Sequence, residues 1–308
     1  MSAPSTGIGV GPRVRPSRSY RAAQTRAAYM FVTPFLVVFV AMLIIPLGYA
    51  AYLSLFRSQL IGGMTFTGLD NFKRALTDAN FLSGVGRMAF FLAIQVPVML
   101  GLALLFALVL DSGRLRFPRV MRLAIFVPYA IPGVVAALMW GYLYGNQFGP
   151  VAQITDFFGL PAPQFLAPGS ALYSLMNIVT WGYTGYNMVI LYAAMRSIPT
   201  ELYEAARVDG AGAIRIAWSI KIPAVRPALL LTAIFSIIGS FQLFNEPSIL
   251  RPLALNAITT DYTPNFYTYS LSFNGQQHNY SAAVAIIMGL ITMVIAYVVQ
   301  LRGMRKGA

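Results

Sequence analysis

The chain of 308 residues is 57% hydrophobic and only 10% charged. Soluble domains usually carry about 25% charged residues, so a soluble globular domain is excluded and an all-α membrane protein is expected. The sequence has no cysteine and one histidine, which excludes disulfides and thiolate chemistry and disfavours a metal site with several side-chain ligands. The formal net charge of +13 needs an explanation from the positions of the basic residues.

The N-terminal segment, residues 1–26, is rich in Ser, Gly, Pro and Arg and contains no acidic residue. This composition predicts a disordered, basic cytoplasmic tail. A cleaved secretory signal needs a short apolar core followed by a small-residue cleavage site. The apolar run after residue 26 is far too long for that, so we expect it to remain as an anchor and residues 27–308 to form one transmembrane domain.

Uncharged apolar runs recur along the rest of the chain. About 20 helical residues span the roughly 30 Å hydrocarbon core of a bilayer, so each run is long enough to cross it. Pro34 and Pro46 can bend the first of the helices. The runs predict six transmembrane helices, over residues 27–56, 88–110, 123–145, 171–195, 227–245 and 281–301.

The basic residues predict the orientation of these helices. Most of the 22 Lys and Arg lie in the N-terminal tail, in segments 111–122 and 196–226, and after residue 301. Because positive loops stay in the cytoplasm, both termini and segment 196–226 are expected there. The same distribution argues against nucleic acid as a partner, since no stacking aromatics alternate with the basic residues. The basic tail leaves contact with lipid headgroups open.

Segment 196–226 is a charged, helix-prone island between two apolar blocks. Thr200 is predicted to cap a short helix, with Glu201 in its first turn beside the positive end of the helix dipole. Ala205 and Ala206 leave one flank of this helix nearly flat, so a partner surface can approach its backbone. Gly210 can adopt positive φ and end the helix.

The same segment carries a recognisable motif. Glu204-Ala205-Ala206, three residues, Gly210, nine residues and then Ile220-Lys221-Ile222-Pro223 resembles the EAA loop of ABC importer permeases, E-A-A-x(3)-G-x(9)-I-x-L-P. Ile222 stands where that family usually has Leu. The longer string from Ile198 to Ala211, which includes Asp209, resembles the maltose-type branch for carbohydrate uptake. Gly68-Leu-Asp-Asn-Phe72 is also similar to the first outer loop of sugar permeases.

This resemblance implies a set of partners in the bacterial cytoplasmic membrane: a second, non-identical permease subunit, two ATPase subunits and an extracytoplasmic binding protein. The sequence has no G-x-x-x-x-G-K-[ST] phosphate loop. We therefore expect no enzyme activity and no bound cofactor in this chain, with ATP and Mg²⁺ used by the ATPase subunits. In the family the EAA loop forms a coupling helix seated on the ATPase, and Glu204 is expected to pair with a basic group there. The residues expected to couple the two subunits are Glu204, Ala205, Ala206, Asp209, Gly210 and Pro223.

Two polar and aromatic stretches predict the substrate path. Aromatic faces stack on sugar rings, and amide or hydroxyl groups bond sugar hydroxyls; polar groups at membrane depth usually face a cavity. The resemblance gives a sugar-contacting role to Tyr186 and to the Phe244-Asn245 pair. Packing between helices or at the lipid interface is the alternative for Tyr186, and a place at the outer edge is the alternative for Glu246. The full predicted set is Tyr183, Tyr186, Asn187, Gln242, Phe244, Asn245 and Glu246.

The sequence leaves alternatives open for the cargo and for the transport mechanism. An oligosaccharide is the expected cargo, with a sugar phosphate or another solute left open. A stand-alone secondary transporter would need ionisable residues within its spans and mirrored halves with paired broken helices, and the predicted spans hold no charge apart from Glu246 at a boundary. A membrane enzyme would need clustered Asp, Glu or His, which the sequence does not offer.

Overall fold

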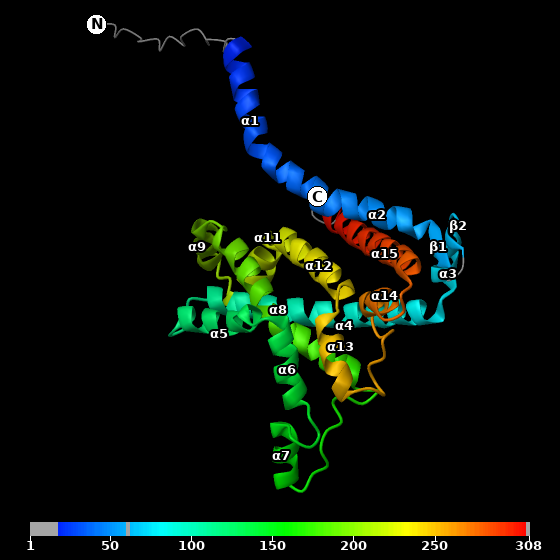
Figure 1. Cartoon of the computed structure of the whole chain (residues 1–308). Coiled ribbons are helices and arrows are strands. Elements are labelled where there is room, and N and C mark those ends of the chain that lie inside the picture. The colour runs from blue at the N-terminus through cyan, green and yellow to red at the C-terminus, as the bar shows by residue number, and fades with distance from the viewer. Residues whose placement is uncertain (1–17, 60–61, 306–308) are drawn as a thin grey trace. The chain divides into compact units, whose positions relative to one another are not determined.

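The computed structural model describes residues 18–59 and 62–305, and the chain forms two units, residues 1–52 and 53–308. Helix α1 (Arg18–Phe39), the π turn η1 (Val40–Ile44) and helix α2 (Ile45–Ser54) make up the first unit and lead into the second (Figure 1). The helix begins at Arg18, inside the segment expected to be a disordered tail. Residues 1–17 of that predicted tail lie outside the described residues.

The expected bend of the first helix takes the form of the π turn. The Ile45 N–H donates to the Val40 carbonyl, five residues back, immediately before Pro46. Proline cannot donate the next helical hydrogen bond, and a wider turn accommodates that loss. Side chains 25–49 of this unit are all exposed, as expected of a helix that meets lipid or another subunit.

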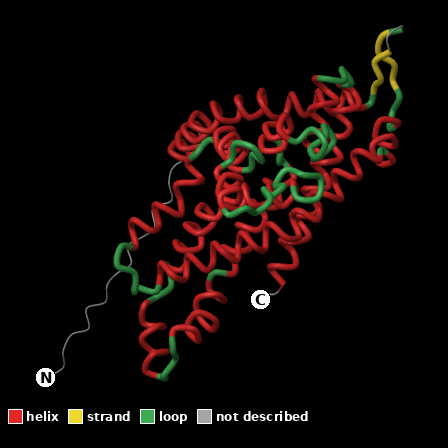
Figure 2. Tube along the Cα trace, turned by 90° about the horizontal axis from the view of Figure 1, so that it is seen from below, coloured by secondary structure: helices red, strands yellow, loops and turns green. Residues whose placement is uncertain are grey.

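A short β-hairpin corrects the all-α prediction. Strand β1 (Phe56–Gln59) pairs antiparallel with β2 (Gly63–Phe66), and helix α3 (Asp70–Thr77) follows (Figure 2). The buried Asn71 amide donates to the carbonyls of Ser54 and Phe56 at 2.9 and 2.8 Å. Asn71 therefore ties α3 to the start of the hairpin, which explains the Asn in the outer-loop motif.

Helix α4 (Ala79–Asp111) starts well before the predicted residue 88. The Asp78 side chain caps it by accepting from the N–H groups of Asn80 and Phe81 at 2.9 and 3.3 Å. The longer helix contains Arg87 and ends at Asp111, so the expectation of charge-free helices was wrong at both of its ends. Its 33 residues reach about 50 Å, which is more than a bilayer core requires.

The third predicted helix is not one rod. Helices α5 (Pro118–Ala130) and α6 (Gly133–Leu143) are separated by a short break and bent by 96°. Pro132 is the N-cap of α6 in an extended conformation, so the α-helical hydrogen bonds stop at the break. A further helix, α7 (Pro150–Phe157), lies in the segment predicted to be a loop.

Helix α8 (Ala171–Arg196) matches the prediction within one residue and lies at the centre of the second unit. It packs along α4 and α5 (Figure 1). Buried side chains between α4 and α8 form one apolar cluster, which extends to Val225 at the end of segment 196–226. The cluster consists of Ala103, Ala107, Leu110, Met188, Leu191, Met195 and Val225.

The remaining elements follow α8 in chain order. The fifth predicted helix ends early, at Phe241, because the chain turns before a new short helix starts at Asn245. The elements are α9 (Thr200–Val208), α10 (Ala213–Ile216), η2 (Ala217–Lys221), α11 (Ile222–Ala224), α12 (Arg226–Phe241), α13 (Asn245–Leu250), η3 (Arg251–Leu253), α14 (Pro264–Phe273) and α15 (His278–Arg305).

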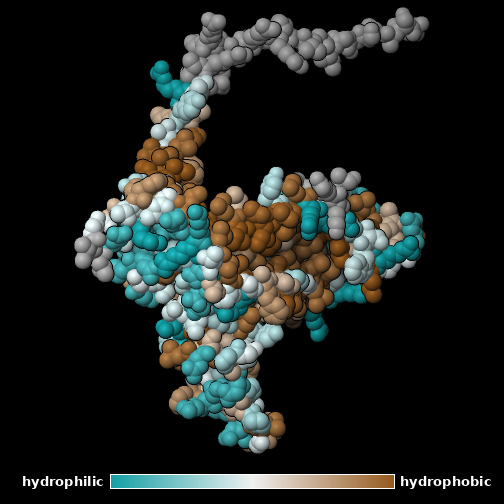
Figure 3. All heavy atoms as spheres, turned by 90° about the vertical axis from the view of Figure 1, so that its right-hand side faces the viewer, coloured by the Kyte–Doolittle hydropathy of each residue, from teal (hydrophilic) through white to brown (hydrophobic). Residues whose placement is uncertain are grey.

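Within the described ranges, four helical stretches are long and apolar enough to cross a membrane: 25–54, 79–111, 226–253 and 278–303. The bent pair α5–α6 makes a fifth if it is one span. Helix α8 has 26 residues but is too polar to meet the same criterion. Figure 3 shows a broad area of apolar side chains bordered by hydrophilic ones on one face, as expected of a surface in contact with lipid.

Candidate substrate cavity and EAA loop

A cavity of about 260 Å³ lies among α4, α8, α12 and the segment that leads into α13. All seven residues of the predicted substrate path line it, although they come from two separate stretches of sequence. Helix α4 adds Gln95 and Met99, and α12 adds Ser236 and Ser240. The structure thus brings the two predicted stretches together and adds a third wall.

The polar groups of this cavity are held by helix packing. Asn187 is only 2% exposed, and its amide donates to the Tyr183 carbonyl at 3.0 Å. Gln95 is 1% exposed, and its Nε2 lies 3.3 Å from Met99 Sδ and 3.5 Å from Thr180 Oγ1. The Gln95 Oε1 atom is buried and has no hydrogen-bond partner among the described residues. A Gln inside an apolar helix was the signal that the sequence analysis overlooked.

Aromatic rings form a continuous group beside these amides. The rings of Tyr129 and Tyr186 are stacked with centroids 4.7 Å apart, and Tyr183 meets Tyr129 edge-on at 5.8 Å. On the other wall, Phe244 leans against Tyr269 at 4.9 Å. Tyr183 remains 47% exposed, which leaves ring surface available for a sugar face. Tyr129 comes from α5 and was not predicted.

Glu246 lies at the junction of two cavities. A second cavity, of about 350 Å³, is lined by the break between α5 and α6 and shares Tyr183 and Glu246 with the first. Glu246 is half-buried and is the one charged group among the described residues that line either cavity. Glu246 therefore forms part of the wall of both cavities.

The EAA loop, residues 196–226, presents α9 as a protruding helix with no buried residue. Its N-cap is Pro199, and Thr200 is the first helical residue, so the predicted cap at Thr200 was wrong by one position. Pro199 takes an extended conformation, and the Thr200 side chain does not cap the helix. Glu201 lies in the first turn as expected.

The end of α9 confirms the predicted role of Gly210. Gly210 adopts φ +78° directly after the C-cap residue Asp209. The Ala211 N–H donates to the Ala206 carbonyl at 2.8 Å and the Gly210 N–H to the Arg207 carbonyl at 3.0 Å. This pair of hydrogen bonds is the Schellman arrangement, which requires a residue with positive φ.

The predicted docking residues lie on accessible positions of the EAA loop. Glu204, Ala205 and Asp209 are exposed and Ala206 is half-buried. Pro223 directly follows the π turn η2, in which the Ile222 N–H donates to the Ala217 carbonyl five residues back, as in the turn before Pro46. In the described part of the chain the ion pairs are Lys73–Asp70 and Lys221–Asp111, so the Glu204 carboxylate is open to a partner.

The sequence match defines the class of protein that carries this fold and cavity. Residues 99–302 match the family described as binding-protein-dependent transport system inner membrane component, and the chain belongs to this family. It is accordingly a permease subunit of an ABC importer, which is a transport component and not an enzyme.

Relatives and solved structures agree with this assignment. The chain is 26% identical to the arabinooligosaccharides transport system permease protein of Halalkalibacterium halodurans, over 89% of this chain and 86% of that one. It is 28% identical to the lactose transport system permease protein of Rhizobium radiobacter, over 87% and 91% of the two chains. A bacterial ABC transporter involved in the import of the polysaccharide alginate matches with a TM-score of 0.82 and 19% identity, over 94% and 99%, which establishes the fold.

Proposed function

We propose that this permease passes a sugar, specifically an oligosaccharide, across the bacterial cytoplasmic membrane. An extracytoplasmic binding protein delivers the sugar, and ATP hydrolysis in partner subunits drives its transport. The observation that supports a sugar as the cargo is the composition of the cavity wall. The wall combines uncharged amides and hydroxyls with aromatic rings: it includes the amides Gln95, Asn187, Gln242 and Asn245 and the rings of Tyr183, Tyr186 and Phe244. The names of relatives with arabinooligosaccharides and lactose as cargo support the same class.

The charge of the cavity favours a neutral sugar over the alternative cargo. Glu246 is the charged group on the described wall, and no Lys or Arg accompanies it there. Sugar phosphates are usually bound by Arg or Lys, which pair with the phosphate oxygens. A proton- or sodium-coupled transporter would use several ionisable groups along the path, and the described wall offers one.

We further propose six membrane crossings with both termini in the cytoplasm. Five of the crossings are the apolar stretches described above, with the bent pair α5–α6 as one of them, and α8 is the sixth. Helix α8 is surrounded by α4, α5 and α12, so its polar residues face protein and the cavity rather than lipid. The polar composition of α8 therefore follows from its central position.

The EAA loop is proposed to dock on one of two ATPase subunits that use ATP and Mg²⁺, while a non-identical permease completes the pathway. Glu204 and the flat Ala205–Ala206 flank would enter a cleft of the ATPase, with Asp209, Gly210 and Pro223 fixing the shape of the loop. ATP can bias the permease only if the ATPase binds its two conformations with different free energy. A helix with a defined end transmits such a bias.

The test is ATP-driven sugar uptake by the reconstituted complex with Glu204→Ala. Removing one partner of a buried ion pair typically costs about 3–5 kcal/mol, so we expect uptake to fall by roughly two orders of magnitude or more. Glu201→Ala in the first turn of the same helix is the matched control, because it removes a comparable exposed carboxylate. Full uptake by Glu204→Ala, with the control also active, contradicts the docking role.

A further inference from the structure

The three helices that line the substrate cavity are connected differently to the EAA loop. Helix α8 runs directly into the loop at its Arg196 end, and α12 leaves the loop at Arg226. Helix α4 supplies Gln95 and Met99 to the cavity but ends at Asp111, far along the chain from the loop. A displacement of the loop therefore reaches α8 and α12 through the backbone and reaches α4 only through side-chain contacts.

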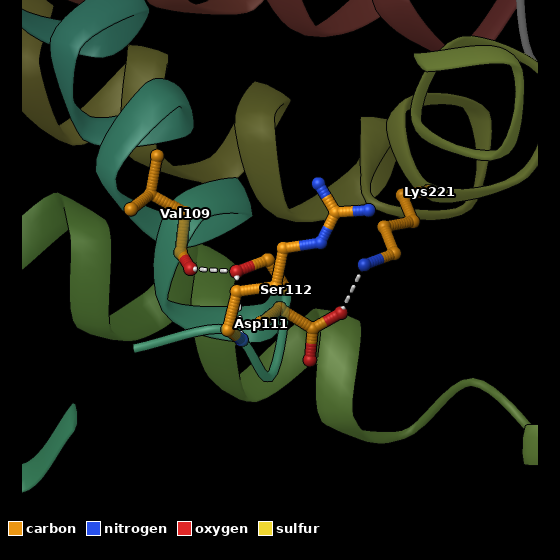
Figure 4. A network of polar contacts seen from close by, with 5 residues as sticks. Val109, Asp111, Ser112 and Lys221 are labelled. Atoms are coloured by element: carbon orange, nitrogen blue, oxygen red, sulfur yellow. Dashed lines mark hydrogen bonds and ion pairs between the residues drawn. The ribbon is translucent and has the colours of Figure 1, made fainter. Parts of the chain in front are cut away.

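A partly buried ion pair makes that contact. Lys221 Nζ lies 2.6 Å from Asp111 Oδ2. The two side chains point toward one another in Figure 4. Asp111 is the last residue of α4, and Lys221 is the last residue of the π turn η2 in the EAA loop. The two side chains are 12% and 6% exposed, in contrast to 79% and 57% for the Lys73–Asp70 pair at 4.0 Å.

Lys221 also contacts the helix proposed to dock on the ATPase. Its Nζ lies 5.2 Å from the ring centroid of Tyr203, which is a cation–π distance. Tyr203 precedes Glu204 on α9, so one lysine side chain bridges α9 and the end of α4. A cavity of about 790 Å³, lined by Glu204, Tyr203, Asp111 and Lys221 among others, lies at the same place. The bridge thus lines an open space rather than a close-packed interface.

Apolar packing near the pair cannot replace it. Leu110 of α4, Met195 of α8 and Val225 of the loop belong to one buried cluster. Hydrophobic contact is non-directional, so such a cluster holds the elements together without a fixed donor and acceptor between them. A charged hydrogen bond with a fixed donor and acceptor specifies the position of one element relative to the other.

We propose that the Asp111–Lys221 pair persists through the transport cycle and moves the end of α4 together with the EAA loop. Asp111 and Lys221 are then positioning residues, and α4 carries the displacement to Met99 and Gln95, about 18 and about 24 Å further along the helix. The inference rests on the proposed function, because it assigns a path to the coupling between ATPase and cavity.

The first experiment measures sugar transported per ATP hydrolysed by the complete reconstituted complex. With Lys221→Met we expect this ratio to fall roughly tenfold or more while ATP hydrolysis continues. The charge-swapped pair Asp111→Lys with Lys221→Asp is expected to restore the ratio to within about threefold. Lys73→Met, which breaks the exposed pair, is the control and leaves the ratio unchanged. A merely structural role would lower uptake and hydrolysis together.

A second experiment uses the absence of cysteine in the chain. Asp111→Cys with Lys221→Cys removes both charges, and a short bifunctional maleimide then joins the two sites; each single cysteine variant, treated alike, is the control. We expect cross-linking to recover the transport ratio to within about threefold of the wild type. This second experiment also tests the proposal if the Lys221→Met complex fails to assemble.

The inference is overturned if the Lys221→Met complex transports sugar per ATP hydrolysed within about twofold of wild type. It is also overturned if the cross-link blocks uptake, because the pair would then have to open during transport. Failure of the wild-type complex to couple ATP hydrolysis to sugar uptake is a different result. That outcome would remove the proposed function itself.

Discussion

Gly185 permits a close approach between the backbones of α8 and α5. A Cβ atom at this position would overlap the carbonyl oxygen of Ile125 and lie 2.8 Å from the Phe126 Cα. Both of those atoms belong to the backbone of α5, which cannot move aside as a flexible side chain can. Gly185 therefore sets the contact of α8 with α5, within two residues of the cavity residues Tyr183 and Tyr186.

Gly185→Ala should destabilise the protein by about 1–3 kcal/mol, because the added methyl group forces α5 away from α8. Gly182→Ala is the matched control on the same helix, since nothing lies within 4 Å of its Cβ position. The midpoint of thermal unfolding of the purified protein measures both variants. Equal midpoints for Gly185→Ala and Gly182→Ala would show that the close approach does not exist.

Asp78 is the acceptor of a polar cluster at the other end of α4. Tyr267 and Tyr280 donate to its Oδ2 at 2.7 and 2.6 Å, and two backbone N–H groups donate to its Oδ1. Burial raises the pKa of Asp78, but these hydrogen bonds outweigh burial and hold the pKa below the ordinary value of 3.8. Burial and the Asp78 carboxylate raise the pKa of Tyr267 to about 12.

These two pKa shifts predict where stability depends on pH. The lowered Asp78 pKa stabilises the folded state above pH 3.8, and this stabilisation is lost as pH falls through the folded-state value. The raised Tyr267 pKa stabilises the folded state below pH 10, and this is lost as pH rises through about 12.

Asp78→Asn isolates the acidic part of this dependence. We expect the wild type to exceed the variant in unfolding free energy by about 1.5–3 kcal/mol at neutral pH, the usual contribution of hydrogen bonds to a charged group. The difference should vanish at the acid limit, where the wild-type carboxylate is protonated. Denaturation in detergent across pH measures it. A difference that stays constant with pH would mean that the carboxylate is not the acceptor.

At the scale of elements, the sequence predicted what local chemistry controls. The composition of α8 and the Gly at position 210 determined α8 and the end of α9 correctly. The break at Pro132 was missed because an apolar run with prolines fits a kinked helix as well as a 96° bend. The early end of α12 at Phe241 was missed because Gln242 and Asn245 suit both a helix and a turn.

Helix α9 has no buried residue, so its local stability depends on its ends. Gly210→Ala places a Cβ at φ +78°, which costs about 1–2 kcal/mol, and should weaken binding of the ATPase subunit about fivefold or more. Gly212→Ala is the control, because Gly212 has φ −73° and open space around it. Affinity of the purified ATPase subunit for each variant is the measurement. Equal affinities would show that the ATPase does not recognise the shape of α9.

At the scale of the whole molecule, the cavity depends on three helices that no local pattern joins. The sequence identified seven of its residues because they interrupt apolar runs, and they do converge on one cavity. It could not identify Gln95 as a neighbour of Asn187, nor Asp111 as the partner of Lys221, because both contacts join segments far apart in sequence. The same limit applied to Tyr129 of α5, which lines the second cavity and stacks on Tyr186.

The account depends most on the side of the membrane to which the EAA loop belongs, and the absence of cysteine makes this directly measurable. Asp209→Cys places a thiol at the exposed end of α9, and Ser58→Cys places one on the hairpin as the control for the opposite side. A membrane-impermeant maleimide should label Asp209→Cys in inside-out vesicles but not in intact cells, and bound ATPase should protect it. Ser58→Cys should show the reverse sidedness. Labelling of Asp209→Cys from outside intact cells would contradict the account.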